Sequence, residues 1–194
     1  QQPLVGERGP LFGACATEIA TGQRVPIALH DKLGRDLGEG IVHLEPLDWS
    51  ADSRRVFVAT APDRTGATML LEIDVTSGVV RIPIAEPTTG FLKLGAELYK
   101  QPNSRIIAGG SQAIWYSERS GYGHLYLYDL ATGELINPIT AGDWPVRDVL
   151  EVDEGKGRIY FTASGREPGD PYQRRVYRVD FDGQNLTLLS PEAA

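Results

Sequence analysis

The chain has 194 residues, with 26 acidic and 19 basic side chains, a formal net charge of -7 and a pI near 5.0. This balance argues against a nucleic-acid-binding protein, because phosphate backbones select for basic patches and the sequence has no basic stripe. Its one cysteine, Cys15, cannot form an internal disulfide, and three scattered histidines with one cysteine do not make a zinc set, so we expect no metal and no cofactor.

Glycine and proline are distributed along the whole chain, with 22 Gly and 13 Pro and no low-complexity tract. This composition indicates many short turns and therefore an all-β fold. No apolar run approaches the length of a membrane-spanning helix. The first residues, QQPLVGERGP, include neither an initiator Met nor a signal pattern, so we expect a fragment of a longer protein.

A glycine-containing turn between two apolar strands recurs four times, at Gly22, Gly78, Gly133 and Gly183. The intervals are 56 residues (22 to 78), 55 residues (78 to 133) and 50 residues (133 to 183). Such a period is too long for a helical solenoid and suits a four-stranded propeller blade. The sequence therefore predicts a partial β-propeller of four-stranded antiparallel blades, with three full blades and a half-blade in one incomplete domain over residues 1–194.

In chain order, the predicted elements fill each period with four strands. Segment 11–29 supplies only the last two strands of a blade, a half-blade. Blade 43–84 runs through HLEPLDW, RRVFVAT, ATMLLEID and VVRIPI. Blade 103–140 runs through SRIIA, AIWYSE, HLYLYDL and ELINPI, and blade 147–190 through VRDVLEV, RIYFTAS, RRVYRVDF and NLTLL. Enrichment in β-branched and aromatic residues favours these strands, and Gly, Asp, Asn and Ser favour the turns between them.

The strand HLYLYDL, residues 124–130, is apolar on both faces, so we expect neighbouring blades to cover it on both sides. The tryptophans at 49, 115 and 144 are expected to fill gaps between blades. His124 begins this strand without a visible carboxylate partner, and we interpret it as a packed, hydrogen-bonded side chain rather than a catalytic base.

Three motifs resemble the amino-terminal propeller region of the dipeptidyl peptidase IV branch of the prolyl oligopeptidase family. They are SERSGYGHLYLYD at 117–129, GDW at 142–144 and YFTASGREP at 160–168. The resemblance is specific from about Asn103 onward, whereas residues 1–100 support the fold more than the family. In that family an eight-bladed propeller caps an α/β-hydrolase domain that carries Ser, Asp and His, and the pair removes dipeptides from peptide amino termini, usually after Pro or Ala. The resemblance implies a parent protein that is a serine-type peptidase, a hydrolase.

The chain itself lacks that chemistry. Its nearest approach to the G-x-S-x-G elbow of an α/β-hydrolase is GGSQA around Ser111, where the fifth residue is Ala113 and no helix pattern follows. We expect Ser111 to be a turn residue. The family also holds the substrate's amino group with adjacent glutamates, and no Glu-Glu pair exists here. We therefore assign no catalytic residue and expect the α/β-hydrolase domain to be absent. We expect the chain itself not to be catalytic, whereas the parent that the resemblance implies is a serine-type dipeptidyl peptidase.

Two regions are candidates for function. The segment AELYKQPNSR leads into an inner strand, and inner strands line the channel of a propeller. By the resemblance, this neighbourhood faces the substrate cavity, and Glu97, Tyr99 and Arg105 are the predicted lining residues. The long loop Ser164–Arg175 is expected at the surface, in contact with a neighbouring domain.

These observations lead to two hypotheses. The first is a non-catalytic propeller fragment that gates access to the substrate cavity of an exopeptidase and shapes it. Its expected partners are the α/β-hydrolase domain of the same chain and the parent's peptide substrates. The alternative is a stand-alone propeller that serves as a protein-interaction platform. Open blade faces also predict self-association, since they leave apolar surface uncovered. We expect a bacterial protein of the periplasm or the cytoplasm.

Overall fold

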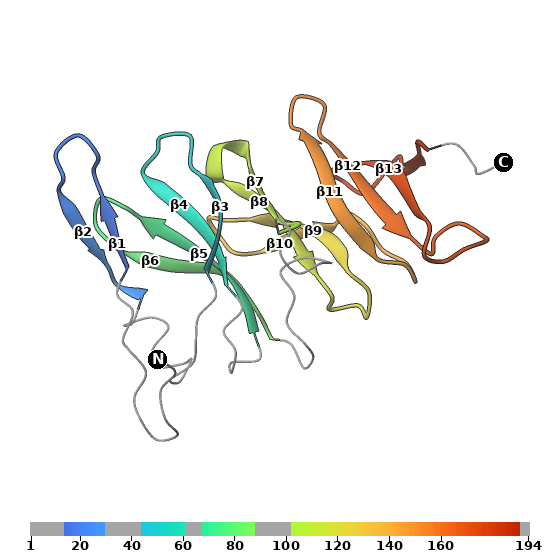
Figure 1. Cartoon of the computed structure of the whole chain (residues 1–194), viewed down its shortest axis with the longest axis horizontal. Coiled ribbons are helices and arrows are strands. Elements are labelled where there is room, and N and C mark those ends of the chain that lie inside the picture. The colour runs from blue at the N-terminus through green and yellow to red at the C-terminus, as the bar shows by residue number, and fades with distance from the viewer. Residues whose placement is uncertain (1–13, 30–43, 61–66, 88–101, 191–194) are drawn as a thin grey trace, which may run out of the picture. The chain divides into compact units, whose positions relative to one another are not determined.

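The computed structural model describes residues 14–29, 44–60, 67–87 and 102–190. The chain divides into two compact units, Gln1–Leu92 and Lys93–Ala194, and each is described by itself. The described residues form fourteen β-strands and one short 3₁₀ turn (Figure 1). Within these residues we find no helix with the length and apolarity that a membrane crossing requires.

The first unit contains an antiparallel hairpin and a four-stranded antiparallel sheet. Ile27 and Leu29, at the end of the hairpin, pack against an apolar cluster of the sheet that includes Leu71 and Val80. The hairpin thus covers part of the sheet's apolar surface. The strands are β1 (Ala14–Thr17) and β2 (Arg24–Ile27) in the hairpin, and β3 (Leu44–Trp49), β4 (Arg55–Thr60), β5 (Ala67–Asp74) and β6 (Val80–Pro87) in the sheet.

The second unit contains two four-stranded antiparallel sheets, each built from strands that follow one another in the chain. The 3₁₀ turn Ala108–Gly110 joins the first two strands of the first sheet. The first sheet consists of β7 (Arg105–Ile107), β8 (Gln112–Ser117), β9 (His124–Asp129) and β10 (Leu135–Pro138), and the second of β11 (Val146–Asp153), β12 (Arg158–Ser164), β13 (Arg174–Asp180) and β14 (Thr187–Leu188).

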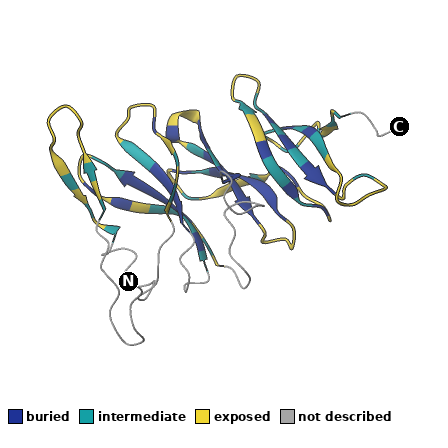
Figure 2. Cartoon of the chain, in the orientation of Figure 1, coloured by how far each residue is buried: buried dark blue, intermediate teal, exposed yellow. Residues whose placement is uncertain are grey.

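One apolar core joins the two sheets of the second unit. Ile114 and Leu125 of the first sheet share this core with Ile159 and Phe161 of the second, and all four side chains are buried. Residues 124–128 of β9 are buried without a break, and the strand is dark blue in Figure 2. Both faces of the strand are therefore buried, as the sequence predicts, and the second sheet of this unit covers the face that carries Leu125 and Leu127.

The turns that lead to the last strand of a sheet are fixed by an acidic side chain. Asp74 Oδ1 accepts the backbone N–H groups of Thr76 and Ser77 at 2.8 and 3.0 Å and the Thr76 hydroxyl at 2.6 Å. The Thr76 hydroxyl and these N–H groups lower the pKa of Asp74 to about 2. Asp129 caps Ala131 and Thr132 in the same way. An acidic residue before a glycine turn thus closes the hairpin locally.

The predicted fold class agrees with these sheets, and two details differ. Trp49 does not fill a gap, because it is 53% exposed, whereas Trp115 and Trp144 are buried as expected. The predicted strand NLTLL is reduced to Thr187–Leu188. Asn185 has a positive φ of 57° and its amide donates to Asp180 Oδ2 at 2.7 Å, so the turn extends further along the chain than the apolar pattern indicates.

Candidate functional site

Strand β11 lies at the edge of its sheet, and side chains of Asn103 and Arg105, from the segment that contains β7, bond to its backbone. Asn103 donates through Nδ2 to the carbonyl of Arg147 at 2.9 Å and accepts the N–H of Val149 through Oδ1 at 3.0 Å. Asn103 is 4% exposed. Its amide therefore replaces the backbone of a neighbouring strand, which satisfies polar groups that would otherwise be buried without partners.

Arg105 continues this edge. Its guanidinium donates to the carbonyls of Ser104 at 2.9 Å, Val149 at 3.1 Å and Pro102. Burial lowers the pKa of Arg105, and the negative charge of Glu151 opposes that shift. A guanidinium held by three carbonyls is fixed in position, because its planar fork cannot rotate without losing them.

A third contact lies at the other end of β7. The N–H of Ala108 donates to Glu154 Oε2 at 2.7 Å. Asn103, Arg105 and Glu154 therefore join β7 to β11 along its length, and we call these three residues with Arg147 and Val149 the β7–β11 seam. Leu150 and Glu151, which follow Val149 on β11, are exposed, and Arg105 is partly buried.

The predicted lining residues divide into two groups. Glu97 and Tyr99 lie outside the described residues. Arg105 is described, and it occupies the seam. Its assignment to a substrate cavity stays a prediction. Sequence analysis did not single out Asn103, because its only signal is a polar NSR triplet at the start of a predicted inner strand.

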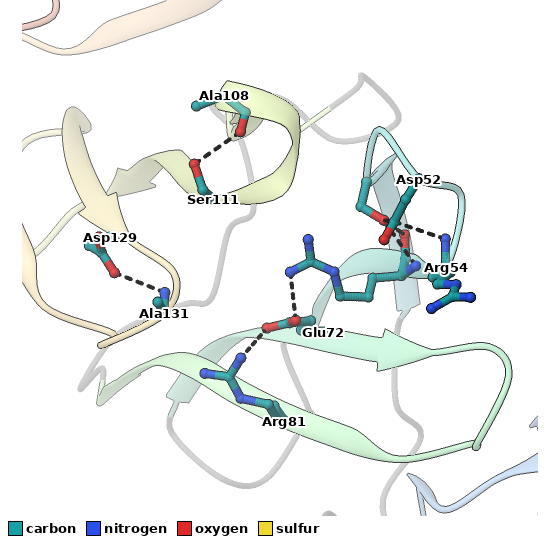
Figure 3. A network of polar contacts seen from close by, with 10 residues as sticks. Asp52, Arg54, Glu72, Arg81, Ala108, Ser111, Asp129 and Ala131 are labelled. Carbon is teal, nitrogen blue, oxygen red and sulfur yellow. Dashed lines mark hydrogen bonds and ion pairs between the residues drawn. The ribbon is translucent and has the colours of Figure 1, made fainter.

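Ser111 has the geometry of a turn residue. Its hydroxyl donates to the carbonyl of Ala108 at 2.9 Å, within the tight turn that Figure 3 shows. Ala108 has a positive φ of 51° and Gly109 one of 64°. The Ser111 hydroxyl has no histidine among its hydrogen-bond partners in the described part of the chain. The interpretation of Ser111 as a turn residue agrees with this geometry.

His124 is buried and bonded at both ring nitrogens. Nε2 lies 2.9 Å from the Gly142 carbonyl and Nδ1 lies 3.0 Å from Thr140 Oγ1. Trp144 meets the imidazole edge-on, with 5.0 Å between the ring centroids. Burial lowers the pKa of His124, and the bond to Gly142 opposes this. The ring therefore ties β9 to the segment after β10, which is the packed role that the sequence predicts.

The first unit holds a buried carboxylate that sequence analysis did not single out. Glu72 pairs through Oε1 with Arg55 at 3.0 Å and through Oε2 with Arg81 at 2.9 Å (Figure 3). The Glu72 side chain is 6% exposed. The register places these residues on the neighbouring strands β4, β5 and β6. Both carboxylate oxygens are paired with arginines, so the cluster joins three strands and offers no free acid or base.

The loop between β12 and β13 is anchored at its base and exposed at its tip. The Arg166 guanidinium stacks on Tyr177 at 5.4 Å and on Trp144 at 6.0 Å from the ring centroids, and it pairs with Glu167. Asp170 Oδ1 caps the N–H of Tyr172 at 2.9 Å, and Tyr172 is 84% exposed. The predicted contact of this loop with a neighbouring domain stays a prediction.

The described residues contain no cluster of three or more His, Cys, Asp or Glu side chains that could hold a metal ion. The seam and the histidine contacts join neighbouring segments of the second unit.

Comparison with known proteins identifies one family. A family model described as the dipeptidyl peptidase IV (DPP IV) N-terminal region matches residues 17–194. A probable dipeptidyl peptidase 4 from Neosartorya fischeri is 26% identical over 193 residues, which are 96% of this chain and 23% of the relative. A probable dipeptidyl-aminopeptidase B from Aspergillus clavatus is 30% identical over 156 residues, which are 78% of this chain and 15% of the relative.

Solved structures show the same fold. Dipeptidyl peptidase 4 from Porphyromonas gingivalis is similar with a TM-score of 0.72 at 20% identity, over 95% of this chain and 24% of that one. TolB from Acinetobacter baumannii is similar with a TM-score of 0.54 at 16% identity, over 93% of this chain and 38% of that one. These likenesses confirm the predicted partial β-propeller. The chain spans about a quarter of the length of the peptidase relatives.

Proposed function

Since this chain belongs to the family of dipeptidyl peptidase IV N-terminal regions, we propose that it is the non-catalytic propeller part of a serine exopeptidase that removes amino-terminal dipeptides. In this proposal the chain is one incomplete propeller domain without the α/β-hydrolase domain. It gates access to the substrate cavity and shapes it. Its partners are the hydrolase domain of the parent and the parent's peptide substrates.

The family match over residues 17–194 carries the proposal. The β7–β11 seam supports the cavity-shaping role, because it fixes Arg105 and keeps Glu151 and Leu150 exposed on an inner strand. Fixed groups position a peptide without losing side-chain entropy when it binds.

The test uses the full-length parent protein and a dipeptidyl chromogenic substrate such as Gly-Pro-p-nitroanilide. In that parent we expect Arg105→Met to raise KM several-fold with little change in kcat, because the seam positions substrate and takes no part in bond cleavage. Arg54→Met, an exposed arginine of the first unit, is the matched control and should leave both constants unchanged. Equal KM values for Arg105→Met and the unmodified parent would contradict the cavity role.

Gating has its own measurement. If the propeller controls entry, kcat/KM should fall with peptide length or bulk in the parent, and a variant with a widened entry should reduce that dependence. If the parent and the variant with the widened entry each cleave short and bulky peptides with the same kcat/KM, gating is excluded. Turnover by the 194-residue chain alone would show that the non-catalytic assignment is wrong.

The interaction platform is the second candidate, since the same fold is found in proteins named TolB as well as in proteins named dipeptidyl peptidase. The two candidates differ in what the parent gene encodes. A hydrolase domain with a G-x-S-x-G elbow in the same reading frame is expected for the exopeptidase. A parent without that elbow would favour the platform.

A further inference from the structure

Strand β11 contains a β-bulge near its start, and Arg147 is the extra residue. Val146 lies opposite Ala163 of β12, and Asp148 already lies opposite Thr162, so the register leaves Arg147 without a residue facing it on β12. A bulge interrupts the alternation of a strand and re-aims the side chain of the extra residue. The direction of the Arg147 side chain is therefore set by its own contacts.

Two contacts hold Arg147 in place. Its Nε donates to the hydroxyl of Ser164 at 2.8 Å, and Ser164 is 2% exposed. Its backbone carbonyl accepts the side-chain amide of Asn103 at 2.9 Å, as part of the β7–β11 seam. Because Nε and the backbone are both bonded, the planar guanidinium has few orientations left. A ligand that binds it loses little side-chain entropy.

The two Nη groups of Arg147 are left over. In the part of the chain that the structure describes, neither group has a hydrogen bond or an ion pair. Other arginines of the same sheet are paired with carboxylates. Arg158 lies 3.1 Å from Asp180. Arg174 lies 3.0 Å from Asp148, so the carboxylate next to Arg147 in the chain is already occupied.

The phenol of Tyr116 and the carboxylate of Glu118 lie near this guanidinium. The Tyr116 hydroxyl donates to Glu118 Oε1 at 3.4 Å. Burial and the charge of Glu118 raise the pKa of Tyr116, and the charge of Arg147 opposes that rise, which places Arg147 within electrostatic reach of the phenol. Glu118 and Arg147 nevertheless form no ion pair within the described residues. The positive charge of Arg147 is therefore held in place without a carboxylate bonded to it.

We propose that the two Nη groups of Arg147 bind the carboxylate of an acidic side chain in a peptide. A carboxylate fits this end of the guanidinium, because its two oxygens accept two parallel N–H groups at once. A neutral amide offers one acceptor oxygen and no charge, so it should bind more weakly. The inference names a substrate class for the function proposed above, and it rests on that function for the peptide. The carboxylate site itself is a property of this chain.

The first test measures carboxylate binding by the 194-residue chain. The probes are N-acetyl-glutamate amide and its neutral counterpart N-acetyl-glutamine amide, and ¹H–¹⁵N NMR of the arginine Nε–H groups is the readout. The Arg147 signal is identified by its loss in Arg147→Lys. We expect the glutamate probe to shift this signal with a Kd in the millimolar range, as for one accessible charge pair, and the glutamine probe to leave it unchanged.

Two variants separate the position of the guanidinium from its charge. Ser164→Ala keeps the charge of Arg147 but frees its Nε, so the Kd for the glutamate probe should rise several-fold. Arg175→Met is the matched control, since the Arg175 guanidinium bonds to the Gln173 side chain at 3.1 Å, and it should bind the probe as the wild type does. Thermal unfolding of every variant establishes that it is folded.

The second test uses the full-length parent and pairs of peptides that begin with Gly-Pro. The two peptides of a pair differ only by Glu or Gln at one of the three positions that follow. We expect the parent to cleave the Glu peptide of at least one pair with a several-fold higher kcat/KM. Arg147→Met should remove this preference and leave kcat/KM for the Gln peptide unchanged.

The outcomes separate this inference from the peptidase role. An Arg147 signal that does not shift, or that shifts equally with both probes, would overturn the carboxylate site. A parent that cleaves the two peptides of every pair equally well would overturn the preference for acidic peptides and leave the peptidase role intact. A parent that releases no dipeptide would contradict the peptidase role, and the NMR titration would still decide whether Arg147 binds a carboxylate.

Discussion

The side-chain oxygen of Asn103 accepts the backbone N–H of Val149 at 3.0 Å, although 46 residues separate them in the sequence. The same side chain donates to the Arg147 carbonyl at 2.9 Å. One amide thus serves as two backbone groups at the edge of β11. Asn103 is the most deeply buried of the three residues that join β7 to β11, and its importance for stability can be measured.

Asn103→Ala should lower the free energy of unfolding by about 2–4 kcal/mol, because it leaves a buried N–H and a buried carbonyl without partners. Urea-induced unfolding of the chain measures this change. Asn137→Ala is the control, since Asn137 also bridges the two sheets but is only partly buried, and it should cost less than about 1 kcal/mol. A larger loss from Asn137→Ala than from Asn103→Ala would contradict the role assigned to the seam.

Stability should fall as the pH drops through the ordinary pKa of histidine, 6.5, because of His124. The Gly142 carbonyl only accepts, so Nε2 of the neutral ring donates to it and Nδ1 accepts from Thr140. Burial lowers the folded-state pKa of His124. Below pH 6.5 the imidazole of residue 124 is protonated in the unfolded chain but stays neutral in the folded chain. This difference stabilises the unfolded state until the pH falls below the lower, folded-state pKa.

The control for this effect is His124→Gln, measured by thermal unfolding from pH 8 to pH 5. The stability difference between wild type and variant should be largest at pH 8 and shrink as the solution becomes acid. A difference that stays constant over this range would show that His124 does not titrate between the folded and unfolded states.

Arg55→Met should destabilise the first unit by about 1–3 kcal/mol, since one oxygen of the buried Glu72 carboxylate loses its ion pair. The double variant Arg55→Met/Glu72→Met should be no less stable than the single one, because it leaves no charge buried and preserves volume. Chemical unfolding compares them, with Arg54→Met as the exposed control. A double variant that is markedly less stable than the single one would argue against an unpaired-charge penalty.

Gly78→Ala should cost more stability than Gly22→Ala. Both replace a glycine with φ of +73°, which costs about 1 kcal/mol by itself. At Gly78 the new methyl would also overlap the Pro26 oxygen, and overpacking adds about 1–3 kcal/mol. Differential scanning calorimetry measures both melting temperatures. Equal losses would mean that the β2 strand moves away without cost.

The repeat of glycine turns and the alternation of apolar residues predicted the four-stranded sheets and the buried strand β9. These features are local, because an acidic residue capping a turn and a β-branched strand depend on neighbours a few positions away. The shortened β14 shows the limit of this reasoning. Asn185 bonds to Asp180 across the turn, and apolar periodicity carries no information on that side-chain contact.

The family resemblance was also readable from residues 117–168, because its motifs are continuous in the chain. Only the tertiary structure decided that Asn103 and Arg105 complete the edge of β11, and that Glu72 is held by two arginines. Those contacts join residues far apart in sequence or on different strands, and their strength depends on burial and on distances of about 3 Å. Local pattern determines which segments become strands, whereas the pairing of buried polar groups is determined only when the sheets meet.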